Sequence, residues 1–186
     1  MMMQDIAMHV LDIGMNSLKA DSSEVKIILK EDTNSSKISF IIIDNGKGMD
    51  EMELKNAQDP FYTTRTTRKF GLGIPFIKAA AEICGGKFLL ESIKGEGTRL
   101  VAEFDSSNID CPPIGNIPDA IVCLMVFDET INLIYQYNYN DLEFIVSTNE
   151  LKKELEDVAI SEPAIQLWLT EYIKENMERL KKEEQS

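Results

Sequence analysis

The sequence has little of the chemistry that metal centres and disulfide frameworks need. Among its 186 residues there is one histidine, His9, and there are three cysteines, Cys84, Cys111 and Cys123, with no CxxC spacing. An odd number of scattered cysteines is typical of reduced thiols in a reducing compartment. A zinc site is not expected either, because His9 is the only histidine.

Long apolar runs and excess positive charge are absent as well. No stretch reaches the roughly 18 apolar residues that a membrane-spanning helix needs. The N-terminus, MMMQD, has no basic region before an apolar run, so we do not expect a signal peptide. A net charge of −13 should repel nucleic acid and anionic membrane surfaces. These features predict a cytoplasmic protein with neither a nucleic-acid nor a membrane partner.

The first half of the chain shows the patterns of an α/β protein. Apolar residues at helical spacing predict a helix over 4–19, and two strands are predicted over 25–30 and 37–43. The second strand ends in an unbroken apolar run, 40–43, which indicates burial on both of its faces. The polar segment 50–69 has no clear periodicity, and no element is predicted in it.

Glycines mark the next helix and a hairpin. A helix is predicted over 74–84, with Pro75 in its first turn. Strands are predicted over 87–94 and 98–104, joined by a glycine-rich turn. Residues 1–105 are therefore expected to form one unit.

A proline-containing linker, 106–117, is expected to lead to a small α+β extension, 118–186. Residues 118–127 are compatible with a helix or a strand, and a helix is favoured. A hairpin is predicted over 131–137 and 142–146. Two further helices are expected, and their capping residues are Ser147 and Ser161.

The last of these helices carries an apolar stripe, which comprises Ile165, Trp168, Leu169, Tyr172, Ile173 and Leu180. A stripe at helical spacing usually packs against the rest of the chain, and that is the favoured interpretation. A surface that binds a partner or forms a homodimer is the alternative.

Four short motifs point to a binding site, and the first is the pair Asp12 and Asn16. A spacing of four places both on one face of the predicted helix. A carboxylate there can hold or polarise a water, and an amide oxygen can ligate Mg²⁺. Taken alone, the pair is equally compatible with two solvated polar residues.

The second motif begins with Asp44, which ends a hydrophobic strand, and continues through Gly46, Gly48 and Met49. The acceptor oxygen of Asp44 can receive the exocyclic amine of adenine, and the glycines let the backbone approach the ring closely. A plain turn is the alternative, because Asp-Asn-Gly is a common turn sequence. The second glycine weakens that alternative.

The third motif is Gly71, Leu72 and Gly73, which opens a helix. Backbone N–H groups at a helix N-terminus bind anions. Three cations stand just before it: Arg65, Arg68 and Lys69. They can neutralise a triphosphate, although a solvated charged loop is the alternative. The fourth motif is Thr98 in the final hairpin, where a threonine can share the water that links the aspartate to adenine; alone, it indicates only a hairpin turn.

In this order, the four motifs resemble the GHKL ATPase family of histidine kinases, DNA gyrase, MutL and heat-shock chaperone ATPases. LDIGMNSLKADSSEVKI is similar to the family's N-box, and DNGKGM matches its first glycine box. Residues 60–104 look like the lid, the second glycine box and the final hairpin. The resemblance covers residues 4–104 and implies the Bergerat fold. That fold is a two-layer α/β sandwich with helices on one face of a mixed sheet, and it binds ATP with Mg²⁺.

The resemblance also implies roles for individual residues. Asn16 would be the Mg²⁺ ligand, and Asp44 would accept the adenine amine, with Gly46 and Gly48 shaping the pocket. Thr98 would be the threonine on the adenine side.

At the phosphate end, Gly71 and Gly73 would belong to the phosphate loop, and Asp12 falls where gyrase and MutL carry the glutamate that activates water. The sequence departs from the family pattern at three positions. Asp12 is one methylene shorter than glutamate, which predicts slow hydrolysis. Asp21 replaces a glycine of MutL-like sequences, and aspartate tolerates a left-handed conformation. Lys69 occupies the first glycine position of the fuller GxGLG pattern.

We therefore expect a kinase-like regulatory protein that binds Mg-ATP and acts with a separate protein partner, as in the anti-sigma-factor serine kinases of this family. Only eleven residues precede Asp12, so a phosphoacceptor hairpin is not expected, and His9 is expected to be a packed or surface residue. A non-enzymatic, ATP-dependent conformational switch and a slow MutL-like ATPase are the alternatives. Residues 118–186 are too short for the gyrase or MutL transducer domain.

Overall fold

The computed structural model describes residues 5–60, 72–156 and 158–184. Its strands are β1 (Glu24–Asp32), β2 (Lys37–Asp44), β3 (Lys87–Ile93), β4 (Gly97–Asp105), β5 (Asn132–Tyr139) and β6 (Leu142–Ser147). Its helices are α1 (Ile6–Leu18), α2 (Glu51–Ala57), α3 (Gly73–Ile83), α4 (Ile117–Phe127), α5 (Thr148–Leu155) and α6 (Pro163–Glu183).

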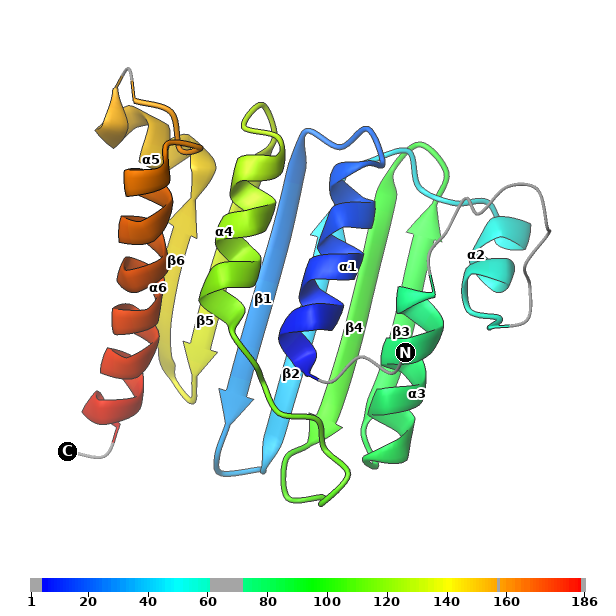
Figure 1. Ribbon diagram of the computed structural model, residues 1–186. Helices are drawn as coiled ribbons and strands as arrows, with labels where there is room; N and C mark the ends of the chain where they lie inside the picture. Colours follow the sequence, from blue (N-terminus) through cyan, green and yellow to red (C-terminus); the bar gives the residue numbers. More distant parts are fainter. Residues whose placement is uncertain (1–4, 61–71, 157, 185–186) are drawn as a thin grey trace.

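The strands form one mixed sheet in the order β3-β4-β2-β1-β5-β6. β1 and β5 are parallel, and the other neighbouring strands are antiparallel. Helices α1, α3, α4 and α6 lie side by side over one face of the sheet (Figure 1). The predicted two-layer α/β sandwich, with a mixed sheet and helices on one face, is confirmed.

Because helices cover one face only, alternate residues of β2 point away from the core. Phe40 and Ile42 are 0% and 1% exposed, whereas Ile43 is 37% exposed. The prediction that this strand is buried on both faces is therefore wrong. A continuous apolar run is typical of parallel strands between two helical layers, but β2 is antiparallel to both of its neighbours.

Residues 118–186 continue the same sheet. β5 pairs along β1, and the predicted hairpin is present as β5 and β6. The favoured helix over 118–127 is confirmed as α4, which packs closely on α1: a Cβ built on Gly14 would lie only 2.6 Å from Leu124 Cδ1. The division at 106–117 stays a prediction about domain organisation, and the structure adds that both segments contribute strands to one sheet.

Two helix starts differ from the sequence prediction. The polar segment 50–69 contains α2, which was missed although Asp50 and Glu53 form a capping box at its first turn. α6 begins at Pro163 with Glu162 as its capping residue, and no side chain caps it, so the prediction of Ser161 as the cap is wrong. A proline at the first helical position sets the backbone angle that a helix needs. Ser147 caps α5 as predicted.

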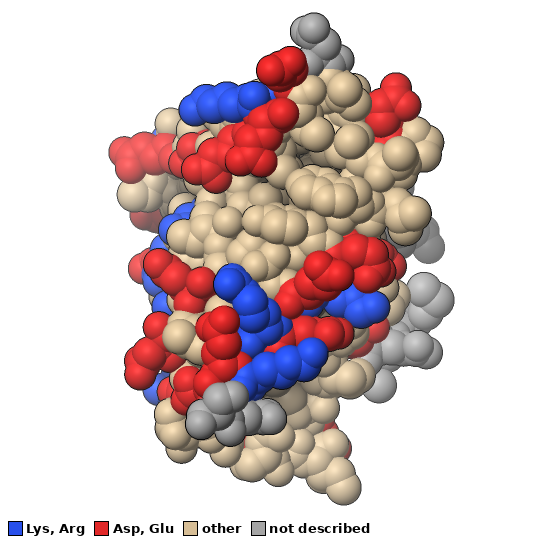
Figure 2. Space-filling view, turned by 90° about the vertical axis from the view of Figure 1, so that its left-hand side faces the viewer, with Lys and Arg blue, Asp and Glu red and all other residues tan. Residues whose placement is uncertain are grey.

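The stripe on α6 is only partly internal. Leu169 and Ile173 are fully buried, and Leu180 is 3% exposed. Trp168 is 46% exposed and stacks on Tyr172 of the same helix with the ring centroids 5.2 Å apart. The expectation that the stripe packs against the rest of the chain therefore holds for its buried members and not for Trp168. Figure 2 views the side of the molecule on which α6 lies, and a broad uncharged band separates clusters of charged side chains there.

None of the helices in the described part of the chain combines the length and the apolar character needed to cross a membrane.

Candidate functional site

A cavity that is partly open to solvent lies between α1, the sheet and the loop after β2. It gathers five residues that the sequence places at a binding site: Asn16, Asp44, Gly48, Met49 and Thr98. The remaining lining is mainly apolar and includes Ile13, Ile42, Ile74, Leu90 and Leu100. Largely apolar walls with a few converging polar groups are typical of small-molecule sites.

Asp44 is the most deeply buried carboxylate at this cavity, and its side chain is held from two sides. Ser17 Oγ donates to Asp44 Oδ2 at 2.7 Å, and the Gly46 N–H donates to Asp44 Oδ1 at 3.0 Å. Thr98 is the direct cross-strand partner of Asp44 in the β2–β4 ladder. This pairing places the predicted carboxylate and the predicted threonine side by side.

The two glycines of this loop sit where a side chain would collide with backbone. A Cβ built on Gly46 would lie 2.5 Å from the Ala20 carbonyl oxygen, and one on Gly48 would lie 2.0 Å from the Ile93 carbonyl oxygen. Gly48 also has a φ of +60°, which favours glycine. The loop is thus pressed between the end of α1 and the β3–β4 turn, which defines one wall of the cavity.

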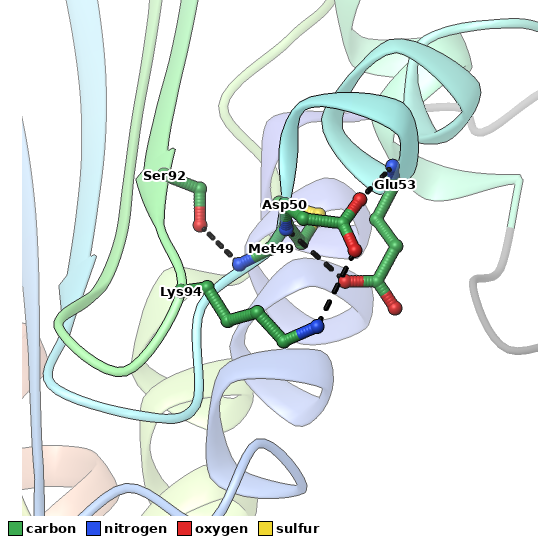
Figure 3. Close-up of polar contacts among 5 residues, drawn as sticks. All are labelled: Met49, Asp50, Glu53, Ser92 and Lys94. Atoms are coloured by element: carbon green, nitrogen blue, oxygen red, sulfur yellow. Dashed lines mark hydrogen bonds and ion pairs between the residues drawn. The ribbon is translucent and has the colours of Figure 1, made fainter.

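Side chains and backbone groups fasten the end of the loop to the hairpin (Figure 3). The Met49 N–H donates to Ser92 Oγ at 2.8 Å, and that hydroxyl lies 2.9 Å from Thr98 Oγ1. Lys94 pairs with Asp50 at 3.3 Å, next to the capping box with Glu53. The hydrogen bond from the Glu53 N–H, above all, lowers the pKa of Asp50.

Asp12 lies one turn before Asn16 on α1 and is not among the residues that line the cavity. Its Oδ2 atom is sealed from solvent and has no hydrogen-bond partner among the described residues. A Cβ built on Gly73 would lie 1.8 Å from that oxygen, so the glycine lets the carboxylate pack against the start of α3. This contact shows that the carboxylate faces the N-terminal turn of α3. Burial raises the pKa of Asp12, and the charge of Lys19 partly opposes the shift.

The predicted phosphate loop is described only in part. Leu72 is the capping residue of α3 and is 38% exposed. Gly71 and the three predicted cations, Arg65, Arg68 and Lys69, lie outside the described residues.

Two further expectations about α1 and the turn after it can be compared with the structure. His9 is 2% exposed, so it is a packed residue, and burial lowers its pKa against the opposing charge of Asp5. Asp21 has a φ of 58°, the left-handed conformation expected where an aspartate replaces glycine.

Comparison with known proteins agrees with this geometry. Residues 4–108 match the family described as histidine kinase-, DNA gyrase B-, and HSP90-like ATPase. The chain belongs to this family.

The chain matches only a part of each individual relative. The chain is 27% identical over 128 residues to the circadian input-output histidine kinase CikA of Synechocystis sp. (strain ATCC 27184 / PCC 6803 / Kazusa), covering 65% of this chain and 17% of that protein. It is 28% identical over 99 residues to a putative sensor protein of Shewanella frigidimarina (strain NCIMB 400), covering 52% of this chain and 15% of that protein. The chain thus spans less than a fifth of these curated relatives.

A solved structure shares the fold at low sequence identity. The crystal structure of the N-terminal domain of a DNA repair protein superimposes with a TM-score of 0.53 at 14% identity. The match covers 77% of this chain and 52% of the other. At this identity, the likeness concerns the fold alone.

In and around the cavity, sequence reasoning missed Ser17, Lys47 and Ser92. Ser17 directly follows Asn16, and its hydroxyl is buried against Asp44. Lys47 lines the cavity, and its backbone N–H donates to Ala20. Ser17 and Lys47 lie inside the N-box and glycine-box segments, so they were detectable, whereas Ser92 is recognisable only from the register of β3 against β4.

Proposed function

We propose that this chain binds Mg-ATP in the cavity beside Asp44 and acts as a kinase-like regulatory protein together with a separate protein partner. The observation that carries the proposal is the buried Asp44 carboxylate at the cavity, held by Ser17 and placed opposite Thr98. In this arrangement Asp44 Oδ accepts from the exocyclic amine of adenine. The apolar walls, Ile42 and Leu100 among them, enclose the ring.

The phosphates and the metal belong at the other end of the cavity. Asn16 lines it, and its amide oxygen would ligate Mg²⁺ together with phosphate oxygens, which is how Mg²⁺ is usually held beside nucleotides. Bound there, the ion would neutralise phosphate charge. The first turn of α3, beginning at Gly73, offers backbone N–H groups to the phosphates. Arg65, Arg68 and Lys69 add positive charge in this proposal.

Asp12 is the proposed catalytic group. Its carboxylate faces the first turn of α3, and Oδ2 is buried without a partner among the described residues. In this proposal the site opens enough on nucleotide binding for Oδ2 to orient a water or an acceptor hydroxyl. Burial raises the pKa of Asp12, which makes the carboxylate a more basic proton acceptor. This favours turnover, and it keeps a slow MutL-like ATPase as a second candidate.

The first experiment measures nucleotide affinity by calorimetry with the unaltered chain, Asp44→Asn and Asp50→Asn. Asp44→Asn replaces the acceptor oxygen facing adenine with an amide that can present a donor, and we expect about 100-fold weaker binding. Asp50→Asn removes an equal charge outside the cavity lining and should keep its affinity within about threefold. Equal affinity for all three proteins would remove Asp44 from its role.

The second experiment decides the fate of the terminal phosphate. Transfer of γ-phosphate label to a protein would identify a kinase. Release of inorganic phosphate that disappears in Asp12→Asn would identify a slow ATPase. Binding without either, accompanied by a change in proteolytic sensitivity, would identify a conformational switch.

The proposal includes a protein partner, which can be a second copy of the chain. It also places the protein in the cytoplasm, without a nucleic-acid or membrane partner. The exposed Trp168, which stacks on the partly buried Tyr172, is the proposed contact. Sedimentation of the purified protein with and without Mg-ATP measures self-association directly.

A further inference from the structure

The face of the sheet turned away from α1, α3, α4 and α6 exposes apolar side chains (Figure 1). Side chains alternate along a strand, so every second residue of each strand points away from the helices. Leu89 and Ile145, on the two edge strands, are 44% and 47% exposed on this outer face, and Ile43 and Ile93 are exposed as well. An antiparallel sheet with one solvated face usually carries polar residues there, so these side chains call for a physical explanation.

The strand register places the apolar side chains in a row that crosses the whole sheet. One residue from each strand belongs to it, and we call it the apolar row: Leu89, Val101, Ile41, Ile28, Gln136 and Ile145. All but one of these residues are aliphatic. Val101 and Ile41 are partly buried and Ile28 is buried, so the row is a packed surface and not a set of isolated side chains.

Charged residues flank the apolar row, two positions away along the strands. On one side, β3 and β4 carry Glu91 and Arg99, which pair at 2.8 Å. On the other side, the same two strands carry Lys87 and Glu103. The order of the charges is therefore reversed across the row: acidic and basic on one side, basic and acidic on the other.

We propose that this face binds the same face of a second copy of the chain, with a twofold axis lying along the apolar row. Rotation about that axis sets each residue of the row against its own counterpart, as in any isologous interface. It also turns each flanking row onto the other. Glu91 of one copy then faces Lys87 of the second copy, and Arg99 faces Glu103, so opposite charges meet on both strands.

The charges also favour this axis over the other twofold arrangement of two stacked sheets. An axis parallel to the strands would set Arg99 against Ile134 and leave the charges of β3 and β4 without partners across the interface. The axis along the row has one cost, because it brings Lys26 of β1 opposite Lys30 of the second copy. The opposite-charge contacts of β3 and β4 are twice as many as these like-charge contacts.

The size of the face suits a small but specific interface. Neighbouring strands lie about 4.8 Å apart, and positions two residues apart along a strand are separated by about 6.7 Å. Six strands and three rows therefore cover about 580 Å² on each copy. The two copies together would bury about 1,200 Å², the lower end of the range for specific interfaces. Face-to-face stacking of two sheets is the arrangement of every β-sandwich.

This interface accounts for the composition of β2. Residues 40–43 are all apolar, although the helices cover only the side that carries Phe40 and Ile42. A second sheet on the outer face would cover Ile41 and Ile43 as well. The candidate nucleotide cavity is lined by Ile42 and Leu100 on the helix side, so it stays accessible in the dimer.

The first test is sedimentation equilibrium of the full chain without nucleotide, and we expect a dimer at micromolar concentrations. Leu89→Glu sets two introduced carboxylates against each other across the axis and should raise the dissociation constant at least about 100-fold. Leu167→Glu is the matched control, because it makes the same change at an exposed position of α6, on the helix-covered side. It should leave the dissociation constant unaltered. Circular dichroism checks that each variant is folded.

The second test exploits the charges of β3. Lys87→Glu sets the introduced glutamate against Glu91 of the second copy, and Glu91→Lys sets the introduced lysine against Lys87. Each variant alone should dimerise about tenfold more weakly than the unaltered chain. An equal mixture of the two variants should recover the original dissociation constant within about threefold, because every β3 contact in the mixed dimer joins opposite charges.

Three results would overturn the proposal. The first is an unaltered chain that stays monomeric at the highest attainable concentration. The second is a dimer that survives Leu89→Glu and is lost in Leu167→Glu, which would place the contact on α6. The third is a mixture of the two β3 variants that associates no more tightly than either variant alone, which is incompatible with an axis along the apolar row.

Discussion

The two ends of the sheet differ in whether their buried polar groups have hydrogen-bond partners. In the C-terminal part, Tyr137 Oη donates to Glu31 Oε1 at 2.7 Å, and Lys181 pairs with the same carboxylate at 2.9 Å. In the N-terminal part, His9 Nδ1 and Asp12 Oδ2 are buried without a partner among the described residues. Buried polar groups are normally satisfied, so this part of the fold leaves hydrogen-bonding capacity unused.

The core side chains show the same contrast. β5 fills its helix-facing side with large rings, of which Tyr135 and Tyr137 are fully buried. Asp44 at the end of β2 and Thr98 at the start of β4 instead lie beside the cavity. The C-terminal part therefore extends and closes the core, whereas the N-terminal part keeps space in it. Both share one sheet, so the comparison can be tested by asking whether they unfold together.

The largest effect is expected from Ile121→Ala in α4, where the side chain is fully buried. Removing most of this side chain leaves a cavity and should lower the free energy of unfolding by about 2–4 kcal/mol. Because β5 is hydrogen-bonded to β1, far-UV circular dichroism and the fluorescence of Trp168, the only tryptophan, should report the same transition in urea. Two separate transitions would show that the regions are independently stable.

A comparable effect is expected from nucleotide. At a Mg-ATP concentration 100 times the dissociation constant, binding to the folded state alone adds about 2.7 kcal/mol. If the two regions unfold cooperatively, the free energy of unfolding measured by Trp168 fluorescence must rise by this amount, although Trp168 is not among the residues that line the cavity. Asp44→Asn at the same nucleotide concentration is the control and should move far less. If nucleotide shifted the unfolding transition seen by circular dichroism but not the one seen by fluorescence, the two regions would unfold independently.

A smaller effect is expected from Trp168→Ala. The indole is 46% exposed, so its removal should change the free energy of unfolding by less than about 1 kcal/mol and leave ATP affinity unaltered. Leu169→Ala, one residue on and fully buried, should cost about 2–4 kcal/mol and serves as the matched comparison. Equal losses for the two variants, measured by urea unfolding, would mean that Trp168 is a core residue after all.

The smallest effect concerns pH and Asp12. A carboxyl whose pKa is raised in the folded state disfavours folding once it is ionised, so that cost is fully present above the folded pKa. It fades as the pH falls towards the ordinary value of 3.8. Asp12→Asn should therefore melt slightly higher than the unaltered chain at pH 7 without nucleotide, and the difference should shrink at pH 4. A difference that grows on acidification would contradict the direction of the shift.

Most helices and strands could be predicted from the sequence, because their side-chain periodicity is local. α1, α3 and the hairpins followed from apolar spacing and from glycine or proline at their ends. α2 was missed although Asp50 and Glu53 carry its start signal, since this short helix turns only Leu54 and Ala57 towards the core. The burial of β2 and the exposure of Trp168 depend on which faces the helices cover, and spacing along the chain does not contain that information.

By itself, the sequence determined the motifs of the candidate site, because Asp44, Gly46, Gly48 and Thr98 have a specific order and spacing. Only the tertiary structure decided that Ser17 holds Asp44 and that β5 joins the sheet beside β1. These contacts join residues distant in the chain, and a strand or helix can find its neighbour only when the whole sheet is assembled.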